Sequence, residues 1–137
     1  MSETIQVVDY FYIEAPDKPG EAARILAQLK DANVNLQAFS GFPEGRRAQL
    51  DFIPADPAAF KAAAKSNKWK LIGPKKCFVI QGEDRVGAVV ELLSKLAEAK
   101  INITATDAVC AGAGRYGMIL WVKPRDVKRA AKALGIT

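Results

Sequence analysis

The feature that most constrains this chain is an internal repeat. The four residues Asp17–Gly20 recur as Asp84–Gly87, and the same offset of 67 residues aligns the chain without a gap from 17 to 38. The matching residues include Ile25-Leu26 with Leu92-Leu93, Leu29 with Leu96, and Val34-Asn35-Leu36 with Ile101-Asn102-Ile103. Because the whole chain has 137 residues, the repeat predicts two small related domains, at 1–74 and 75–137.

Each repeat has the same predicted order of strand, helix, strand, strand and helix. In the first repeat, residues rich in β-branched and aromatic side chains predict strands at 6–14, 34–42 and 48–53, with a short fourth strand at 69–72. Pro19 fits the first turn of one helix, with Asp17 or Lys18 near its cap, and Asp56-Pro57 opens the other. Pro43-Glu44-Gly45 predicts a turn, and Gly73-Pro74 separates the repeats.

The second repeat follows the same plan. Strands are predicted at 76–81, 101–110 and 116–122, with a hairpin loop at 111–114 and a last helix that starts at Pro124. Only three residues follow that helix, so the final strand is expected to be short or missing. An apolar stripe at helical spacing predicts the first helix, and consists of Val86, Val89, Val90, Leu93, Leu96 and Ala97.

This order predicts an α+β fold of two ferredoxin-like βαββαβ repeats, with antiparallel sheets and the helices on one face. The other sheet face should be polar if each unit stands alone. Instead Val8, Tyr10 and Tyr12 alternate with Val7, Phe11 and Ile13. A lone unit of this size is also marginally stable. We therefore expect the units to pack together, to form a homodimer, or both.

The two loops and the residues after them resemble the ACT domain, a regulatory family. The resemblance rests on Asp17-Lys18-Pro19-Gly20 followed by Ala32-Asn33-Val34-Asn35-Leu36, and on Asp84-Arg85-Val86-Gly87 followed by Ala99-Lys100-Ile101-Asn102-Ile103. It covers nearly the whole chain as two tandem copies. It implies a ferredoxin-like fold that binds small molecules, most often amino acids, between paired domains and that regulates an enzyme or a transcription factor.

The loops suit a small anionic or zwitterionic ligand. A helix N-terminus presents unpaired N–H groups and a partial positive charge, and glycine lets a carboxylate approach the backbone. By resemblance, Gly20 and Gly87 occupy that place, while Asn35 and Asn102 supply amides that can donate and accept. The candidate ligand-binding residues are Asp17, Lys18, Pro19, Gly20 and Asn35 in the first repeat, and Asp84, Arg85, Val86, Gly87, Ala88 and Asn102 in the second.

The two loops differ in their suitability. Glu21 follows Gly20 where the family usually has an apolar residue, and a carboxylate there would repel a ligand carboxylate. Val86 stands where the family commonly has proline, but Ala88 leaves room and Arg85 adds positive charge. The second loop is therefore the favoured site, although either loop could be only a tight turn.

Catalysis has little support in the sequence. The chain has no histidine, so its four serines lack the usual activating base. Its two cysteines, Cys77 and Cys110, match no metal-ligand spacing. We therefore expect a binding protein that is not an enzyme and that holds no cofactor and no metal. The N-terminus lacks a secretory signal and no apolar run reaches the ~18 residues of a membrane helix, which predicts a cytoplasmic protein without membrane contact.

Two other functions remain open. The RNA-recognition motif shares this topology, and residues Gly114–Trp121 with Phe78 partly match its stacking pattern. The basic excess also lies in residues 75–137, where Lys123, Arg125, Lys128, Arg129 and Lys132 cluster, which suits a solvated helix face or an acidic partner. A ligand-free oligomerisation domain is the other alternative. With nothing else attached, a sensor would have to act on another protein.

Overall fold

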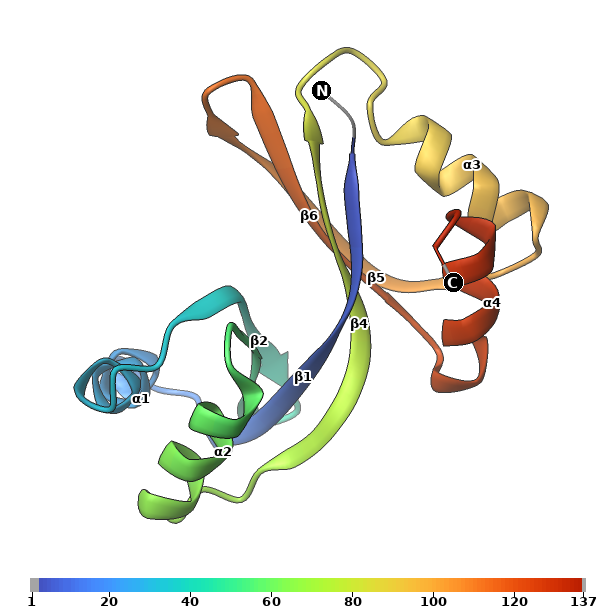
Figure 1. Cartoon of the computed structure of the whole chain (residues 1–137). Helices are drawn as coiled ribbons and strands as arrows, with labels where there is room; N and C mark the ends of the chain where they lie inside the picture. Colours follow the sequence, from blue (N-terminus) through green and yellow to red (C-terminus); the bar gives the residue numbers. More distant parts are fainter. Residues whose placement is uncertain (1–2, 137) are drawn as a thin grey trace. The chain divides into compact units, whose positions relative to one another are not determined.

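The computed structural model describes residues 3–136 and separates them into two compact units (Figure 1). The N-terminal unit is Asp9–Lys75, and the C-terminal unit combines the described residues of Met1–Val8 with those of Lys76–Thr137. Two strands, β1 (Thr4–Pro16) and β4 (Ile72–Glu83), each contribute residues to both units. Each unit is described separately below.

In the N-terminal unit the strand order is β2-β3-β1-β4, with β2 spanning Leu36–Glu44 and β3 spanning Arg47–Pro54. Strand β3 pairs antiparallel with both neighbours, which places Phe52 opposite Phe11 and Phe39. Helices α1 (Glu21–Asp31) and α2 (Pro57–Ser66) cover the same face of this sheet (Figure 1). As predicted, Asp56 caps α2, and its carboxylate accepts from the N–H groups of Ala58 and Ala59.

In the C-terminal unit the order is β1-β4-β6-β5, with β5 spanning Ile103–Gly112 and β6 spanning Arg115–Val122. Helices α3 (Val90–Glu98) and α4 (Val127–Ala133) share one face, and a 3-10 turn, η1 (Pro124–Asp126), precedes α4. The last strand that the sequence lacks is supplied by the start of β1, where Ile5 packs against this unit's core. Both units are thus α+β with helices on one sheet face, and the predicted fold class is confirmed.

The two cores are built from different side chains. In the N-terminal unit the ring of Phe60 lies 5.1 Å from that of Phe11 and 5.2 Å from that of Phe52. Trp69 lies 6.1 Å from Phe52, and its indole N–H donates to Gln28 at 3.1 Å. The core of the C-terminal unit is mainly aliphatic. Its fully enclosed side chains are Phe78, Ile80, Leu92, Leu96, Leu120 and Ala130.

Helix α1 begins later than the sequence predicted. Gly20 stands at the cap with φ +89°, so α1 starts at Glu21 and Pro19 lies in the preceding turn. The predicted stripe of the next helix also needs correction. Helix α3 starts only at Val90, Val86 is fully exposed, and the buried face is formed by Ala88, Leu92 and Leu96. Gly20 before α1 and Gly87 before α3 both have positive φ, and each delays the start of its helix. The spacing of apolar residues does not reveal such a turn.

The segment around Gly73-Pro74 was predicted to separate the repeats, between a strand at 69–72 and another at 76–81. Instead β4 runs from Ile72 to Glu83 without interruption. The strand predicted at 69–72 is largely absent, because Lys68 at φ +59° ends α2 and Trp69 turns into the aromatic core. The aromatic residue that suggested a strand therefore serves as core packing.

The sheet face of the N-terminal unit that lies opposite its helices holds a buried acidic residue beside the buried Ile53. Asp51 lies on this face, since its neighbours Leu50 and Phe52 point into the core. It is buried, and it accepts a hydrogen bond from the Gln49 amide at 2.9 Å. Burial raises the pKa of the Asp51 carboxyl, against the opposing effects of the Gln49 hydrogen bond and the Lys75 charge.

Replacing Asp51 with asparagine should therefore stabilise the protein at neutral pH. A carboxyl whose folded pKa is raised contributes stability that is complete below its unfolded pKa of about 3.9 and is lost as the pH rises through the folded pKa. Thermal unfolding of Asp51→Asn and the parent should show a higher Tm for the variant at pH 7 and a shrinking difference towards pH 3. Exposed Asp107→Asn is the control, and an equal gain there would contradict the burial argument.

Candidate functional site

A hollow of about 310 Å³ lies beside the start of α3 in the C-terminal unit. Its rim is the loop after β4, which contributes Asp84, Arg85, Gly87 and Ala88. Val89 and Val90 begin the helix side of the wall, and the ends of β5 and β6 complete it with Ala108, Val109, Cys110 and Tyr116. The lining is thus polar along the loop and largely apolar elsewhere.

The loop is fixed by its own backbone. The N–H of Asp84 donates to the Gly114 carbonyl at 2.9 Å, which ties the loop to the β5–β6 hairpin. Gly87 adopts φ +75°, and a Cβ added there would meet no atom within 4 Å. The chain therefore exposes its backbone to the hollow at the point where α3 is about to begin. The first turn of a helix leaves N–H groups without intrahelical partners and carries a partial positive charge.

Charged groups of both signs border the hollow. A guanidinium nitrogen of Arg85 lies 3.0 Å from a carboxylate oxygen of Glu91, and both side chains are exposed. Asp84 stands close to the Cys110 thiol and raises its pKa, through a hydrogen bond first and through its charge. Cys110 is consequently held as a neutral thiol rather than a nucleophilic thiolate.

Tyr116 anchors one wall of the hollow. Its ring is buried in the core of the C-terminal unit, and its hydroxyl donates to the Glu3 carboxylate at 2.9 Å. Burial raises the pKa of Tyr116 to about 12, with further contributions from the Glu3 hydrogen bond and charge. The hydroxyl therefore remains a hydrogen-bond donor at neutral pH.

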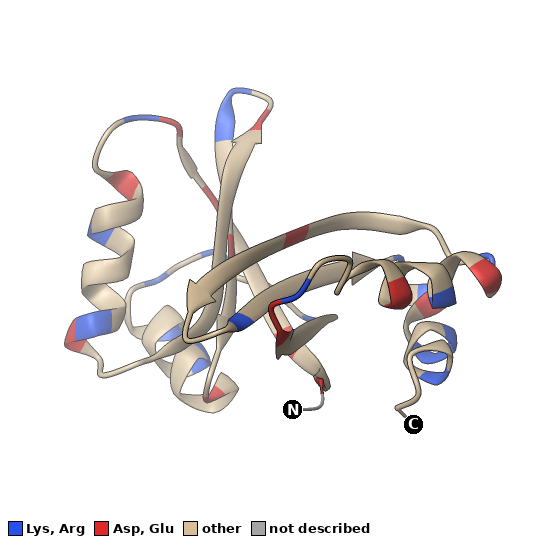
Figure 2. Cartoon of the chain, turned by 90° about the horizontal axis from the view of Figure 1, so that it is seen from above, with Lys and Arg blue, Asp and Glu red and all other residues tan. Residues whose placement is uncertain are grey.

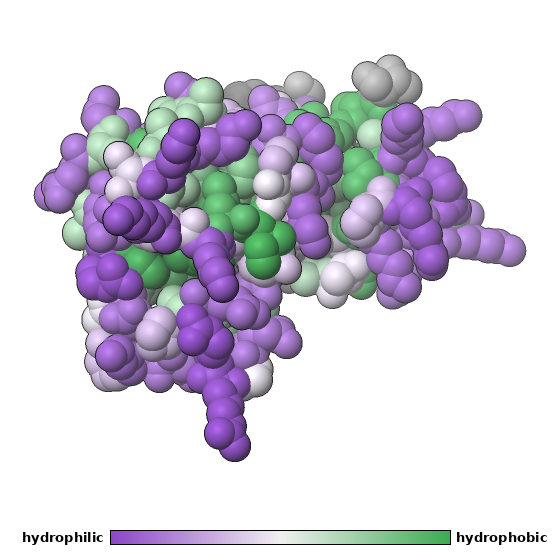
Figure 3. All heavy atoms as spheres, turned by 90° about the horizontal axis from the view of Figure 1, so that it is seen from below, coloured by the Kyte–Doolittle hydropathy of each residue, from purple (hydrophilic) through white to green (hydrophobic). Residues whose placement is uncertain are grey.

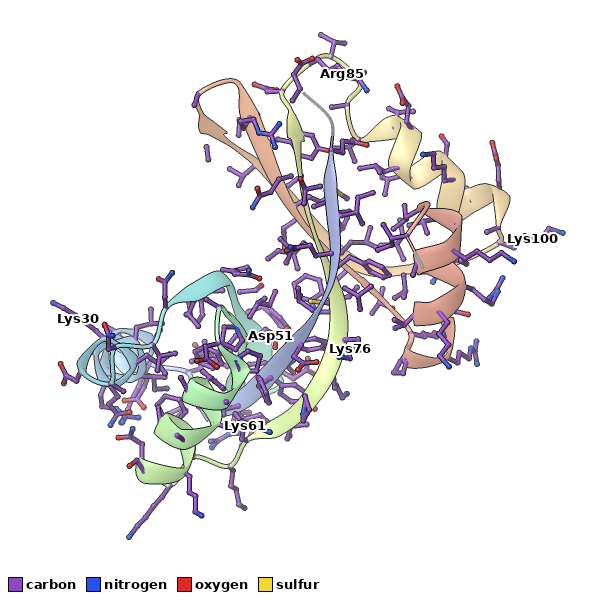
Figure 4. All side chains as sticks on the ribbon, viewed as in Figure 1. Lys30, Asp51, Lys61, Lys76, Arg85 and Lys100 are labelled. Carbon is purple, nitrogen blue, oxygen red and sulfur yellow. The ribbon has the colours of Figure 1, made fainter. Side chains whose placement is uncertain are left out.

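The structure brings most of the second loop's candidate residues together, but not all of them. Asp84, Arg85, Gly87 and Ala88 line one hollow, whereas Val86 is fully exposed and does not. Asn102 lies beyond the far end of α3, whose nine residues span about 14 Å. Figure 4 shows the same separation, with Arg85 and Lys100 labelled at opposite ends of that helix.

In the first repeat the candidates are separated in the same way. Asp17, Lys18, Pro19 and Gly20 are exposed in the turn before α1. Asn35 lies beyond the other end of this helix, in a hollow of about 370 Å³ that it shares with Asn33 and Lys30. The structure therefore does not join the first loop and its asparagine into one site.

Sequence reasoning missed the strand residues of the hollow. Strand pairing places Tyr116 directly between Gly82 on β4 and Cys110 on β5. The three residues therefore lie side by side across the sheet. Finding these residues from the sequence would have required the register in which β4, β6 and β5 pair. Ala108 and Cys110 belong to no sequence motif, so the sequence contained no signal that marks them as lining a binding site.

The arrangement contradicts base stacking of the RNA-recognition kind. Stacking aromatics must face outward from the sheet, but Phe78 and Tyr116 both point into the helix-covered core. Their exposed fractions are 0% and 5%. The partial RNA-binding pattern in the sequence is therefore made by core residues.

The described residues show neither a cluster of metal-ligating side chains nor a helix that could cross a membrane. Among residues 3–136 no group of three or more His, Cys, Asp or Glu side chains could hold a metal ion. Within the same range no helix combines the length and apolar character needed to cross a membrane.

Solved structures of other proteins share the architecture of this chain. The arrangement of two ferredoxin-like units in one chain is also found in solved structures of other proteins. The chain is similar to protein BT0572 from Bacteroides thetaiotaomicron, with a TM-score of 0.82, 18% identity, and coverage of 95% of this chain and 88% of that one. It is also similar to the regulatory subunit of aspartate kinase from Thermus thermophilus in its ligand-free form, with a TM-score of 0.67, 15% identity, and coverage of 98% and 95%.

A further similarity is to the structure of aspartokinase alpha and beta subunits, with a TM-score of 0.63, 17% identity, and coverage of 98% of this chain and 95% of that one. No family model matches the chain, and no curated protein matches it. At these identities the likeness concerns the fold alone.

Proposed function

We propose that this chain is a tandem ACT-type regulatory module that binds an amino acid in the hollow beside Gly87. The observation that carries the proposal is the meeting of an open glycine backbone, charges of both signs and an apolar wall in one hollow of about 310 Å³. The solved structures with this fold include regulatory subunits of aspartate kinase, which supports a regulatory function rather than a catalytic one.

Each part of the hollow suits one part of an amino acid. The ligand carboxylate would pair with Arg85 and accept from the N–H of Gly87, since the N–H groups of Ala88 and Val90 already donate to the Arg85 and Gly87 carbonyls. The ligand amine would pair with the carboxylate of Asp84, which lines the same hollow. The side chain would then lie on Ala88, Val90 and Ala108, which favours an amino acid with an apolar side chain over a charged one.

A protein that only binds an amino acid exerts regulation by changing its interaction with another molecule. Ligand that binds only the folded state adds stability by mass action, and a change of output requires two states with different ligand affinity. We propose that the regulated target is a separate protein that recognises one of those states.

The glycines of the two repeats provide a matched pair for the test. Gly20 and Gly87 both have positive φ, and an added Cβ would meet no atom within 4 Å at either position. Alanine should therefore cost each variant a similar ~1–2 kcal/mol of backbone strain. Only Gly87→Ala should block the close approach of a ligand to the hollow.

We expect a thermal-shift screen against the twenty amino acids to show stabilisation by at least one with an apolar side chain. Calorimetric titration should then show affinity reduced at least about tenfold, or ~1.4 kcal/mol, in Gly87→Ala and retained in Gly20→Ala. Retained affinity in Gly87→Ala with loss in Gly20→Ala would move the site to the first loop. No response to any amino acid would reject the sensor and favour a ligand-free oligomerisation domain.

A further inference from the structure

The internal repeat extends to the second helix of each unit. The positions that match at the offset of 67 residues are Pro57 with Pro124, Lys61 with Lys128, Ala63 with Ala130, Ala64 with Ala131 and Lys65 with Lys132. Side chains four residues apart are neighbours on a helix surface. Helices α2 and α4 therefore each carry two adjacent lysines, which we call the α2 lysine pair (Lys61 and Lys65) and the α4 lysine pair (Lys128 and Lys132).

Both lysine pairs face solvent. All four side chains are exposed, because α2 buries Phe60, Ala63 and Ala64, and α4 buries Ala130, on the side that faces the core. Within residues 3–136 none of the four lysines forms a salt bridge. Their charges are therefore available to a partner.

Few carboxylates lie along the chain beside these pairs. Residues 57–82 contain six lysines and neither Asp nor Glu. The acidic residue nearest to the α4 lysine pair in the sequence is Asp126, which is buried and accepts a hydrogen bond from Arg129 at 2.8 Å. Figure 2 shows basic residues on the α4 ribbon next to the C-terminus. Figure 3 shows that hydrophilic side chains cover most of the face seen from below, the side on which α2 lies in Figure 1.

The first helix of each unit carries no such excess of positive charge. Helix α1 has two acidic and two basic residues, and its Arg24 lies 3.0 Å from Glu21. Helix α3 has two glutamates and one lysine, and Arg85 donates to Glu91 at 3.0 Å. The positive charge is therefore a feature of the second helices and not of the helices of this chain in general.

We propose that the outer faces of α2 and α4 are two equivalent docking surfaces for acidic segments of the regulated protein. This inference deepens the proposed function and rests on it for the partner's role, because it names the surfaces that hold the target. Each lysine pair matches two carboxylates four residues apart on a helix, since both spacings are about one helical turn. Complementary charge of this kind speeds the encounter and selects the partner. The exposed Ala62, between Lys61 and Lys65, leaves room for such a segment to approach α2.

An acidic protein segment fits these surfaces better than a nucleic acid does. Phosphates are bound most effectively by the planar guanidinium of arginine, and residues 57–82 contain no arginine. Single-stranded nucleic acids also stack their bases on exposed aromatic rings. The aromatic residues of this segment cannot serve in that way, because Phe60 and Phe78 are fully buried and Trp69 packs against the core of the N-terminal unit.

Three double variants test these surfaces, and each removes two positive charges from exposed positions. They are Lys61→Gln/Lys65→Gln on α2, Lys128→Gln/Lys132→Gln on α4, and the matched control Lys30→Gln/Lys95→Gln on α1 and α3. Glutamine forms helices about as readily as lysine, so circular dichroism should be unchanged in all three. The probe is a short helical peptide with glutamates four residues apart, added to isotopically labelled protein in the absence of any amino acid.

We expect the peptide to shift the NMR amide resonances of α2 and α4 at low ionic strength, since salt screens exposed charges. Each lysine-pair variant should bind the peptide at least about fivefold more weakly at its own helix and unchanged at the other, because two exposed ion pairs are lost. The control should behave as the parent does. Absence of shifts on α2 and α4, or an equal loss of affinity in the control, would overturn the proposal.

A short duplex DNA is the second probe. The lysine-pair variants should lose more affinity for the peptide than for the DNA, relative to the control. A larger selective loss for the DNA would assign the two surfaces to nucleic acid and would also overturn the proposal. Because no amino acid is present, these outcomes do not depend on the hollow beside Gly87, and the amino-acid titration stands or fails separately.

Discussion

Replacing Phe52 with alanine is expected to lower the free energy of unfolding by about 3–5 kcal/mol, the usual cost of removing a buried aromatic ring. Phe52 has an exposed fraction of 0% and lies at the centre of the aromatic core, 5.2 Å from Phe60 and 6.1 Å from Trp69. It also stands opposite both Phe11 and Phe39 across strand pairs. The space left behind borders the rings of Phe39, Phe60 and Trp69, which cannot all move inward to fill it.

Urea unfolding followed by tryptophan fluorescence would measure this loss, since Trp69 stacks on Phe52 at an interplanar angle of 17°. The control is Phe42→Ala, which removes the same ring from a half-exposed position of β2. That variant should lose under ~1 kcal/mol. Equal losses at the two positions would show that the aromatic cluster does not determine the stability of this unit.

The architecture was predictable from the sequence because the repeat appears at a single offset. Ile25, Leu29, Leu92 and Leu96 are buried at equivalent places on α1 and α3. A chain that repeats its apolar spacing and its turn residues must form similar local structure twice. The α+β class follows from that local structure, since period-two and helical segments alternate within each copy.

The assignment of strands to units was not predictable in the same way. Residues 4–8 and 9–16 form one continuous strand, yet they belong to different compact units. Apolar alternation shows that a segment is a strand but does not show which strands lie beside it. The sequence therefore predicted a missing last strand, where the structure uses the beginning of β1.

The residues that line the candidate hollow were predictable only where the residue type determines the backbone conformation. Gly87 indicated the loop because few other residues adopt φ +75°. Asn102 was assigned to the same site by resemblance to the family's ligand-binding amide, but it follows the end of α3 whereas Gly87 precedes its start. Ala108 and Tyr116 enter the hollow through strand register, which depends on pairing between distant segments.

The contact between Gly82 and Tyr116 gives the second large expected effect. A Cβ on Gly82 would lie 2.6 Å from a ring carbon of Tyr116 and 3.0 Å from the Glu3 side chain. The ring cannot yield freely, because it is 5% exposed and its hydroxyl is bonded to Glu3. Gly82→Ala should therefore lower the free energy of unfolding by about 1–3 kcal/mol, as overpacking does in closed cores.

Gly117→Ala is the matched control for this prediction. Gly117 lies next to Tyr116 on β6, and a Cβ there would meet no atom within 4 Å. Its stability should change by under ~1 kcal/mol. Tyr116→Leu should in turn reduce the cost of Gly82→Ala, because a shorter side chain removes the ring atoms that the new methyl meets, and a double-mutant cycle measures that coupling. An additive cycle would mean that the loss arises elsewhere in β4. A non-additive cycle would show that the Tyr116 ring can occupy its place in the wall of the hollow because residue 82 has no side chain.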